Sequence, residues 1–160
     1  MKSICFFIYD LKTGGAEKVV IYLANYFSEK NKEVILLTVA DGNNLSHLIN
    51  PKIKVISLNK RRLLNVIPAL IRFIKSEDID CFISNVWPLT IVSSFIILFS
   101  RKVKLVFVEH CNLSQQFKNK NYFFKILQNI SISIFYRLPH HVVTVSEGVK
   151  EDLISKGAKR

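Results

Sequence analysis

The sequence contains little of what marks disordered, secreted or metal-binding proteins. Only 5 of its 160 residues are glycine and 4 are proline, while 49% are hydrophobic, which predicts one folded domain. The three cysteines (Cys5, Cys81 and Cys111) form no CxxC pair, which favours reduced thiols in the cytoplasm, with Cys5 and Cys81 filling the core. No spacing of Asp, Glu, His and Cys suggests a metal site, and nothing in the sequence requires a cofactor.

Three signature motifs are also missing, and each absence excludes a function class. The sequence has no GxGxxG after its first apolar run, no GxxxxGK[ST] and no GxSxG. A dinucleotide fingerprint, a P-loop and a hydrolase nucleophile elbow are therefore unsupported. The longest apolar run, Leu89–Phe99, is shorter than the ~20 residues that cross a bilayer and predicts a buried helix. The first residues lead directly into a strand rather than a signal peptide.

Acidic residues are few relative to basic ones. The chain has 12 Asp and Glu against 23 Lys and Arg, which gives a formal net charge of +11. This excess favours a polyanionic partner such as an anionic membrane surface, a phosphorylated ligand or nucleic acid. A lysine-rich soluble surface is the alternative. Because no recognised nucleic-acid-binding module is present, we do not expect nucleic acid as a partner.

Apolar β-branched runs alternate with segments of helical periodicity along the whole chain. The alternation predicts an α/β fold, with an open, mostly parallel sheet and helices on both faces, as a single domain over residues 1–160. The expected strands are Ile4–Tyr9, Val34–Val39, Ile53–Leu58, Cys81–Ser84, Leu105–Val108 and His141–Val145. The expected helices are Glu17–Ser28, Leu64–Ile74 (with Pro68 as a kink or in the first turn), Leu89–Phe99, Gln116–Arg137 and Val149–Ser155. The link from Val39 to Ile53 predicts a loop with one turn near Leu45–Ile49.

Polar residues follow most of the strands, at the sheet edge where open α/β folds bind ligands. They are Lys12–Gly15, Asp41-Gly42, Ser84-Asn85 with Trp87-Pro88, Glu109–Asn112 and Ser146–Gly148. Gly14 and Gly15 precede a helix, where free backbone N–H groups and the helix dipole predict an anion site, with phosphate as the usual anion. A plain tight turn is the alternative.

His110 is the candidate catalytic residue. It follows four apolar residues at a strand end, and a histidine can exchange a proton near neutral pH or hold a substrate hydroxyl. A histidine satisfied by a backbone carbonyl is the alternative. Glu109 either orients His110 or faces the other way and pairs with a lysine. His140 and His141 are expected to be structural or exposed, and His47 carries no signal.

Other residues at the strand ends are candidates for substrate binding. Ser146 is predicted to cap the last helix, a position from which it also reaches a ligand. The candidate substrate-binding residues are Gly14, Gly15, Glu109, Asn112, Ser146 and Glu147.

The segment Phe117–Leu138 mixes basic and aromatic residues. Helical spacing groups Phe123, Ile126, Leu127, Ile130 and Ile134 into one stripe, which predicts contact with the core. Tyr122, Phe124, Ile132 and Phe135 widen this stripe beyond one buried face. A basic, aromatic, amphipathic helix also predicts docking on an anionic lipid surface. The candidate contact residues are Lys118, Lys120, Tyr122, Phe124, Lys125 and Arg137.

Four segments, in this order, resemble the N-terminal domain of retaining family-4 glycosyltransferases of the two-Rossmann-domain (GT-B) class. They are Gly14–Val20 with Leu23–Asn25, Asp80–Ser84, Glu109–Asn112 and Val142–Leu153. The combination of GGAE and EHxN is most similar to bacterial members that extend lipid-linked glycans or lipopolysaccharide. The resemblance implies a Rossmann-like acceptor-binding domain, with a C-terminal donor-binding domain that is absent from this chain.

The resemblance also implies roles for individual residues and partners. Gly14 and Gly15 would approach the diphosphate of a nucleotide-sugar donor, and His110 would lie near the transferring sugar and the acceptor hydroxyl. The helix after His110 would contact a glycan or lipid-linked glycan acceptor and the membrane. The enzyme would be cytoplasmic or peripheral on the inner face of the cytoplasmic membrane, and these 160 residues alone would be inactive. The alternatives are a non-catalytic Rossmann-like binding or membrane-docking module and half of a sugar-nucleotide epimerase.

Overall fold

The computed structural model of the chain describes residues 2–12, 14–42, 44–100 and 102–158. Its strands form one sheet in the order β3-β2-β1-β4-β5-β6, and every neighbouring pair is parallel. They are β1 (Ser3–Ile8), β2 (Glu33–Thr38), β3 (Lys54–Ser57), β4 (Cys81–Asn85), β5 (Lys104–Glu109) and β6 (His141–Thr144). The predicted open parallel sheet is confirmed, with the Rossmann-like topology in which strands wind outward from β1 and from β4.

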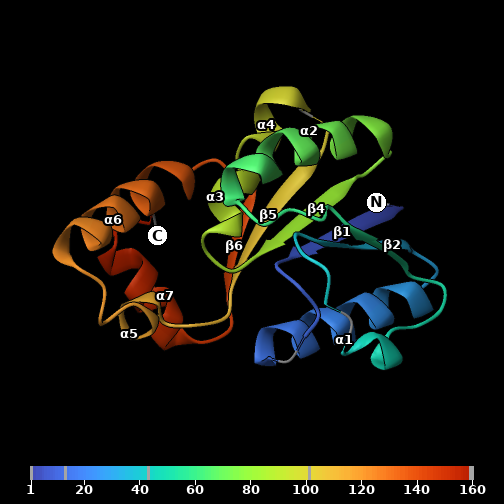
Figure 1. The fold of residues 1–160 in the computed structure, drawn as a ribbon, viewed down its shortest axis with the longest axis horizontal. Helices are drawn as coiled ribbons and strands as arrows, with labels where there is room; N and C mark the ends of the chain where they lie inside the picture. Colours follow the sequence, from blue (N-terminus) through green and yellow to red (C-terminus); the bar gives the residue numbers. More distant parts are fainter. Residues whose placement is uncertain (1, 13, 43, 101, 159–160) are drawn as a thin grey trace.

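Helices cover both faces of this sheet, as predicted (Figure 1). α1 (Gly15–Glu29) lies on one face, and α2 (Val66–Ser76), α3 (Leu89–Ser93) and α4 (Ile96–Phe99) lie on the other. α5 (Leu113–Gln116), α6 (Tyr122–Phe135) and α7 (Glu147–Ser155) gather at the β6 end of the sheet. Two 3-10 helices, η1 (Ser46–Leu48) and η2 (Leu63–Asn65), lie in the connections. η1 is the single turn predicted within the link from Val39 to Ile53.

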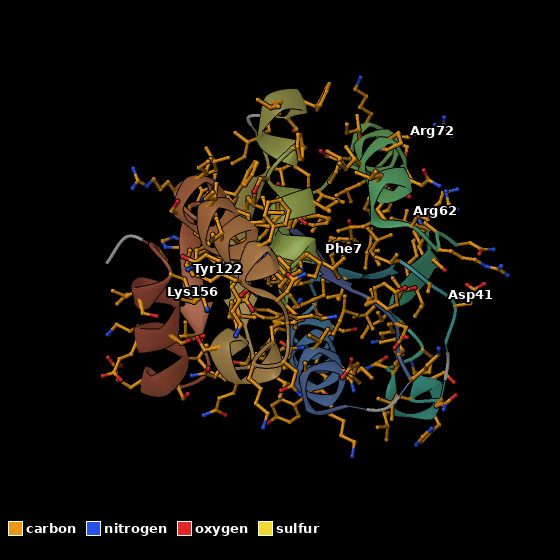
Figure 2. The ribbon with its side chains drawn as sticks, turned by 60° about the vertical axis from the view of Figure 1, so that its left-hand side comes forward. Phe7, Asp41, Arg62, Arg72, Tyr122 and Lys156 are labelled. Atoms are coloured by element: carbon orange, nitrogen blue, oxygen red, sulfur yellow. The ribbon has the colours of Figure 1, made fainter. Side chains whose placement is uncertain are left out.

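β1 lies at the centre of the core because helices cover both of its faces. Cys5 and Phe7 belong to the apolar cluster beneath α2 and α3, whereas Ile4, Phe6 and Ile8 belong to the cluster beneath α1. Figure 2 shows Phe7 in the interior of the molecule, surrounded by other side chains. Every residue of β1 is buried, as the period-two alternation of a doubly covered strand requires.

The prediction of one buried helix over Leu89–Phe99 is wrong in its second half. The segment forms two short helices, α3 and α4, with a turn between them. Ser93 Oγ lies 2.9 Å from the carbonyl oxygen of Leu89, and such back-bonding competes with a continuous helix. The same oxygen lies 2.8 Å from Ser84 Oγ on β4, so the small serine side chain lets α3 pack closely on the sheet. The side chains at the end of α4 are exposed.

The single helix predicted over Gln116–Arg137 is also divided. α5 ends at Gln116, and α6 begins at Tyr122 because the Asn121 side chain accepts a hydrogen bond from the Phe124 N–H group (2.9 Å). The capping asparagine therefore determines where α6 begins. The hydrophobic periodicity extends across this position, so it predicted a helix that starts too early.

The face of α6 that meets the core is not the predicted one. All five side chains that were predicted to be buried are exposed: Phe123, Ile126, Leu127, Ile130 and Ile134. Gln128 and Ile132 are buried in its place. Trp87 Nε1 donates to Ser131 Oγ (3.2 Å), and Tyr136 is buried against the sheet. Hydrogen bonds of polar side chains therefore determine which face of α6 is buried. The hydrophobic periodicity of the sequence gives no sign of these hydrogen bonds.

β6 is less covered than the predicted strand. Val142 and Val143 are both exposed, although the sequence predicts a strand buried on both faces. Within the described residues, β6 pairs only with β5 and forms one edge of the sheet. An edge strand keeps an apolar sequence without a second neighbour to cover it, so the run of valines alone does not show burial.

Candidate active site at the carboxyl edge of the sheet

One amide side chain joins the ends of three strands. Asn85, the last residue of β4, donates from Nδ2 to the carbonyl oxygens of Phe7 on β1 (3.1 Å) and of Ile83 (3.2 Å). Its Oδ1 lies 3.0 Å from Nε2 of His110, the residue after β5. The winding of the sheet reverses between β1 and β4, and ligands bind in the crevice outside such a switch point. His110 therefore lies where a ligand site is expected.

The hydrogen bonds of Asn85 define the tautomer of His110. Both Nδ2 contacts are to carbonyl oxygens, which only accept, so Oδ1 must face the imidazole and Nε2 must donate. Neutral His110 then keeps an unprotonated Nδ1, which is a hydrogen-bond acceptor. Burial lowers the pKa of His110, which favours the neutral ring near pH 7. The partner of His110 is thus a side-chain amide rather than the backbone carbonyl considered from the sequence.

Glu109 is fully buried beneath this site. Its exposed fraction is 0%, and its carboxylate accepts hydrogen bonds from the Tyr136 hydroxyl and from the Trp87 N–H group (3.2 Å). The Thr90 hydroxyl lies 3.5 Å from Glu109 Oε1 and 2.8 Å from the Tyr136 oxygen. Burial raises the pKa of Glu109 from 4.5 to about 7, against the opposing effect of the hydrogen bonds from Tyr136, Trp87 and Thr90.

Neither contact predicted for Glu109 is present. Among the described residues, the hydrogen-bond partners of its carboxylate are Trp87, Thr90 and Tyr136, and they include neither His110 nor a lysine. The alternation of β5 explains this outcome, because Leu105, Phe107 and Glu109 share the face that α3 and α6 cover. Glu109 therefore joins the turn after β4 to the end of α6, and its predicted contact with substrate stays a prediction.

The turn that carries Trp87 contains a strained residue. Val86 has φ of +64°, a left-handed conformation that is an outlier for a β-branched side chain. Its N–H group donates to the carbonyl of Val108 (2.9 Å), and the turn directs Asn85 toward His110 and the Trp87 N–H group toward Glu109. Strain of this kind is retained where the surrounding structure holds it, often at a functional site.

The two glycines begin α1 beside the switch point. Gly14 is the N-cap residue, with an extended φ of −179°, and no described side chain caps the helix. A Cβ on Gly14 would collide with the Glu17 carboxylate, whereas a Cβ on Gly15 would meet no atom within 4 Å. The first-turn N–H groups have no described side-chain cap, although the Glu17 carboxylate lies close to Gly14, and the predicted phosphate contact stays a prediction. The Leu11 N–H group donates to the Gly42 carbonyl (3.0 Å), which joins the loops after β1 and β2.

Three further candidates have defined structural roles. Asn112 caps α5 by accepting from the Gln115 N–H group (3.0 Å). Ser146 caps α7 by accepting from the Val149 N–H group (3.3 Å), which confirms the predicted cap. Glu147 is exposed and forms an ion pair with Lys150 (2.8 Å). The predicted contacts of these residues with substrate stay predictions.

The basic and aromatic candidates near α6 do not form a single surface. Lys118, Lys120, Tyr122 and Arg137 are exposed, and Figure 2 shows Tyr122 on the side of the molecule away from Asp41, Arg62 and Arg72. Lys125 donates from Nζ to the Lys118 carbonyl (2.8 Å). Phe124 turns inward against Trp87 (ring centroids 5.7 Å apart).

Two hollows adjoin this region and share the side chains of Phe117 and Gln128. We call the larger one the apolar groove. It has a volume of about 600 Å³ and is lined mainly by Leu63, Trp87, Ile91, Phe117, Phe124 and Leu127. We call the smaller one the polar pocket. It has a volume of about 110 Å³ and is lined by Leu113, Ser114, Phe117, Lys125, Gln128 and Lys156.

Sequence reasoning missed several of the residues that build this site. Asn85 lay among the strand-end residues but received no role, and Tyr136 and Thr90 were absent from the candidates. The signal for Asn85 is its position at the end of the strand beside the switch point, where it pairs with Val108, two residues before His110. No pattern in the sequence links Tyr136 to Glu109, 27 positions away, because their contact depends on how α6 packs.

Metal and membrane signals are absent from the part of the chain that the structure describes. In residues 2–12, 14–42, 44–100 and 102–158, no group of three or more His, Cys, Asp and Glu side chains could hold a metal ion. Over the same residues, no helix combines the length and apolar character needed to span a bilayer.

The fold is a Rossmann-like α/β domain, and its candidate site lies at the carboxyl edge of a parallel sheet, where folds of this class bind ligands. The sequence matches the family model described as Glycosyltransferase Family 4 over residues 13–160, so the chain belongs to this family. The predicted family resemblance is therefore confirmed. No curated protein sequence matches the chain significantly.

Two solved structures share the fold. The chain is similar to Anabaena Alr3699/HepE in complex with UDP (TM-score 0.76, 19% identity) and to the same protein in complex with UDP and glucose (TM-score 0.73, 20% identity). Each match covers 99% of this chain and 42% of that chain, so the present chain spans less than half the length of HepE. At this level of identity, the likeness concerns the fold.

Proposed function

We propose that the chain is the N-terminal, acceptor-binding domain of a glycosyltransferase that uses a nucleotide-diphosphate sugar. The observation that carries this proposal is His110, held by Asn85 at the switch point of a Glycosyltransferase Family 4 domain. HepE, which shares the fold, has been solved with UDP and with glucose. These ligands favour a uridine diphosphate sugar as the first donor to test. The donor-binding domain would follow residue 160, and these 160 residues alone would be inactive.

The geometry suggests how His110 takes part in the transfer. With Nε2 donating to Asn85, the neutral ring accepts through Nδ1 a hydrogen bond from a hydroxyl of the acceptor or of the transferring sugar. The low pKa of His110 keeps this acceptor available at neutral pH. Asn85 is the positioning residue, because its amide fixes which nitrogen carries the proton.

The start of α1 supplies the complementary electrostatic contribution. When the sugar leaves, negative charge develops on the diphosphate, and preorganised N–H groups stabilise such charge. In this proposal the first-turn N–H groups after Gly14 and Gly15, which no described side chain caps, would supply this stabilisation. Departure of the diphosphate with retention of configuration at the sugar is the outcome that we expect.

The surplus apolar surface of α6 supports a lipid-linked acceptor at a membrane. Five large apolar residues lie on its outer face: Phe123, Ile126, Leu127, Ile130 and Ile134. Lysines at positions 118 and 120 precede the helix and are exposed. This combination fits a helix lying in the interface of an anionic bilayer, on the inner face of the cytoplasmic membrane.

Product analysis of the full-length protein tests the proposed function. The protein is incubated with a panel of labelled nucleotide sugars, beginning with uridine diphosphate sugars, and with membrane lipids extracted from its source. We expect a glycosylated product and a released nucleoside diphosphate. An epimerised nucleotide sugar would instead identify the alternative epimerase, and failure to bind any nucleotide sugar would favour a non-catalytic module. NMR of the product's anomeric centre tests retention.

A further inference from the structure

The apolar groove and the polar pocket adjoin and differ in chemistry. The groove walls are mostly aromatic and aliphatic, with Lys120, Gln128 and Ser131 as their polar members. Trp87 packs edge-on against Phe117 and Phe124 at ring-centroid distances of 5.3 and 5.7 Å. The pocket presents side-chain donors from Ser114, Lys125 and Lys156, and no acidic side chain lines it. One ligand that spans both hollows must therefore carry an apolar part and an anionic part.

Gln128 gives a second indication of a ligand. Its exposed fraction is 1%, and its Nε2 group has no hydrogen-bond partner among the described residues. A buried amide donor without a partner costs about 1–3 kcal/mol, so such a group is expected to meet an acceptor in the functional state. Gln128 lines both hollows, so its buried, unpartnered donor lies beside the place where the apolar and anionic parts of one ligand would join.

The two lysines that line the polar pocket, Lys125 and Lys156, favour an anionic ligand. Lys156 is buried, with an exposed fraction of 9%, and it lines the pocket together with Lys125. Lys125 gives one of its three N–H donors to the Lys118 carbonyl, which leaves two for a ligand. Asp152 is the nearby carboxylate, and the Ser114 N–H group already donates to it (3.1 Å). A buried ammonium is expected to have an anionic partner, and a phosphate supplies oxygens for several donors at once.

We infer that the two hollows together bind the lipid phosphate of the acceptor, with the hydrocarbon chain in the apolar groove and the phosphate in the polar pocket. This inference rests on the proposed function, since it names the acceptor class of the same site. Trp87 connects the groove with the candidate site, because it lines the groove, stands two residues after Asn85 and donates its N–H group to Glu109. An acceptor anchored in this way would present its sugar hydroxyl toward His110.

Trp87 is the only tryptophan in the sequence and lines the groove, so its fluorescence reports occupancy directly. The 160-residue chain is titrated with hexyl, octyl and decyl phosphate below their micelle concentrations, and with decanol and inorganic phosphate. We expect saturable binding of the alkyl phosphates, with affinity rising about threefold to fourfold per added methylene. Decanol and inorganic phosphate should each bind at least about tenfold more weakly than decyl phosphate.

Matched variants separate the two hollows. Leu127→Asp introduces a charge into the groove at a half-exposed position (50%), and Ile134→Asp introduces the same charge at a similarly exposed position of α6 outside it (55%). Lys156→Met removes a pocket charge, and Lys150→Met removes an exposed charge from the same helix. Leu127→Asp should abolish alkyl phosphate binding, and Lys156→Met should weaken it at least about tenfold. The two control variants should bind like the unaltered chain, and circular dichroism establishes that each variant is folded.

Three results would overturn the inference. They are no saturable response of Trp87, equal binding of decanol and decyl phosphate, and equal losses in the groove variant and its control. The titration uses no donor and no transfer reaction. If it fails while the full-length protein glycosylates an acceptor, the lipid-phosphate site is wrong and the proposed function stands. If alkyl phosphates bind but no sugar is transferred, the proposed function is wrong.

Discussion

α1 and α6 are helices of similar length, 15 and 14 residues, that meet their surroundings in opposite ways. α1 buries Val20, Ile21, Ala24 and Ser28 against the sheet, and its outer face carries Lys18, Tyr22 and Tyr26. α6 is the more apolar helix but buries only Gln128 and Ile132 among the described residues. Apolar content therefore does not measure burial. The exposed apolar side chains of α6 lie beside the candidate site, whereas the buried apolar side chains of α1 cover one face of the sheet.

Truncating one buried and one exposed side chain of α6 should produce the largest difference in the free energy of unfolding. Ile132 is fully buried and Ile134 is 55% exposed on the same helix. Ile132→Ala should lower the free energy of unfolding by about 2–4 kcal/mol, because it removes buried methyl groups and leaves a cavity. Ile134→Ala should change it by less than about 0.5 kcal/mol. Urea denaturation measures both, and equal losses would show that the outer face of α6 is packed in the isolated chain.

The pH dependence of stability tests the buried contact between Glu109 and Tyr136, which joins β5 to the end of α6. Because the folded pKa of Glu109 (about 7) exceeds its ordinary value of 4.5, the folded state binds the extra proton. Its contribution is fully present below pH 4.5 and is lost as pH rises through 7, by on the order of 3 kcal/mol. The lowered pKa of His110 acts with the opposite sign at acidic pH.

Comparison with Glu109→Gln isolates the effect of Glu109, because His110 is present in both proteins. Denaturant midpoints between pH 4.5 and 8.5 should fall more steeply for the unaltered chain than for the variant. Parallel pH profiles would show that Glu109 does not take up a proton on folding.

Membrane binding tests whether the outer faces of α1 and α6 differ in function. The double variant Ile130→Asp/Ile134→Asp should weaken sedimentation with anionic liposomes about tenfold or more, because two apolar anchors are lost. The control Tyr22→Asp/Tyr26→Asp adds the same charge to the exposed face of α1 and should bind nearly as well as the unaltered chain. Equal weakening in both variants would indicate attraction through net charge alone, and no binding by any protein would argue for a soluble acceptor.

The smallest expected effect is on the protonation and the tautomer of His110 when its partner Asn85 is changed. Asn85→Asp places a carboxylate against Nε2 and should raise the pKa of His110, because the negative charge stabilises the protonated ring. Asn85→Ala removes the partner and should mix the two neutral tautomers. Nitrogen-15 NMR of the imidazole measures both quantities, and His141, which is exposed, gives the reference signal in the same spectra. A tautomer that is unchanged in Asn85→Ala would show that another group sets it.

The sequence was sufficient for the sheet because each strand carries its own apolar signal and the alternation with helices implies parallel pairing. It also located His110, since a polar residue after an apolar strand falls at the carboxyl edge. It failed where contacts between distant segments decide the outcome. The rotation of α6 depends on the bond between Trp87 and Ser131, and the burial of Glu109 depends on Tyr136. Neither bond leaves a periodic pattern in the sequence.

The central claim is that His110 acts on a sugar hydroxyl in a glycosyltransferase. The measurement that tests it most directly is kcat/KM for sugar transfer by the full-length protein with His110→Ala, beside the exposed control His141→Ala. The account predicts a loss of about 100-fold or more for His110→Ala at unchanged stability, and no loss for the control. Transfer by His110→Ala at the rate of the unaltered protein would contradict it.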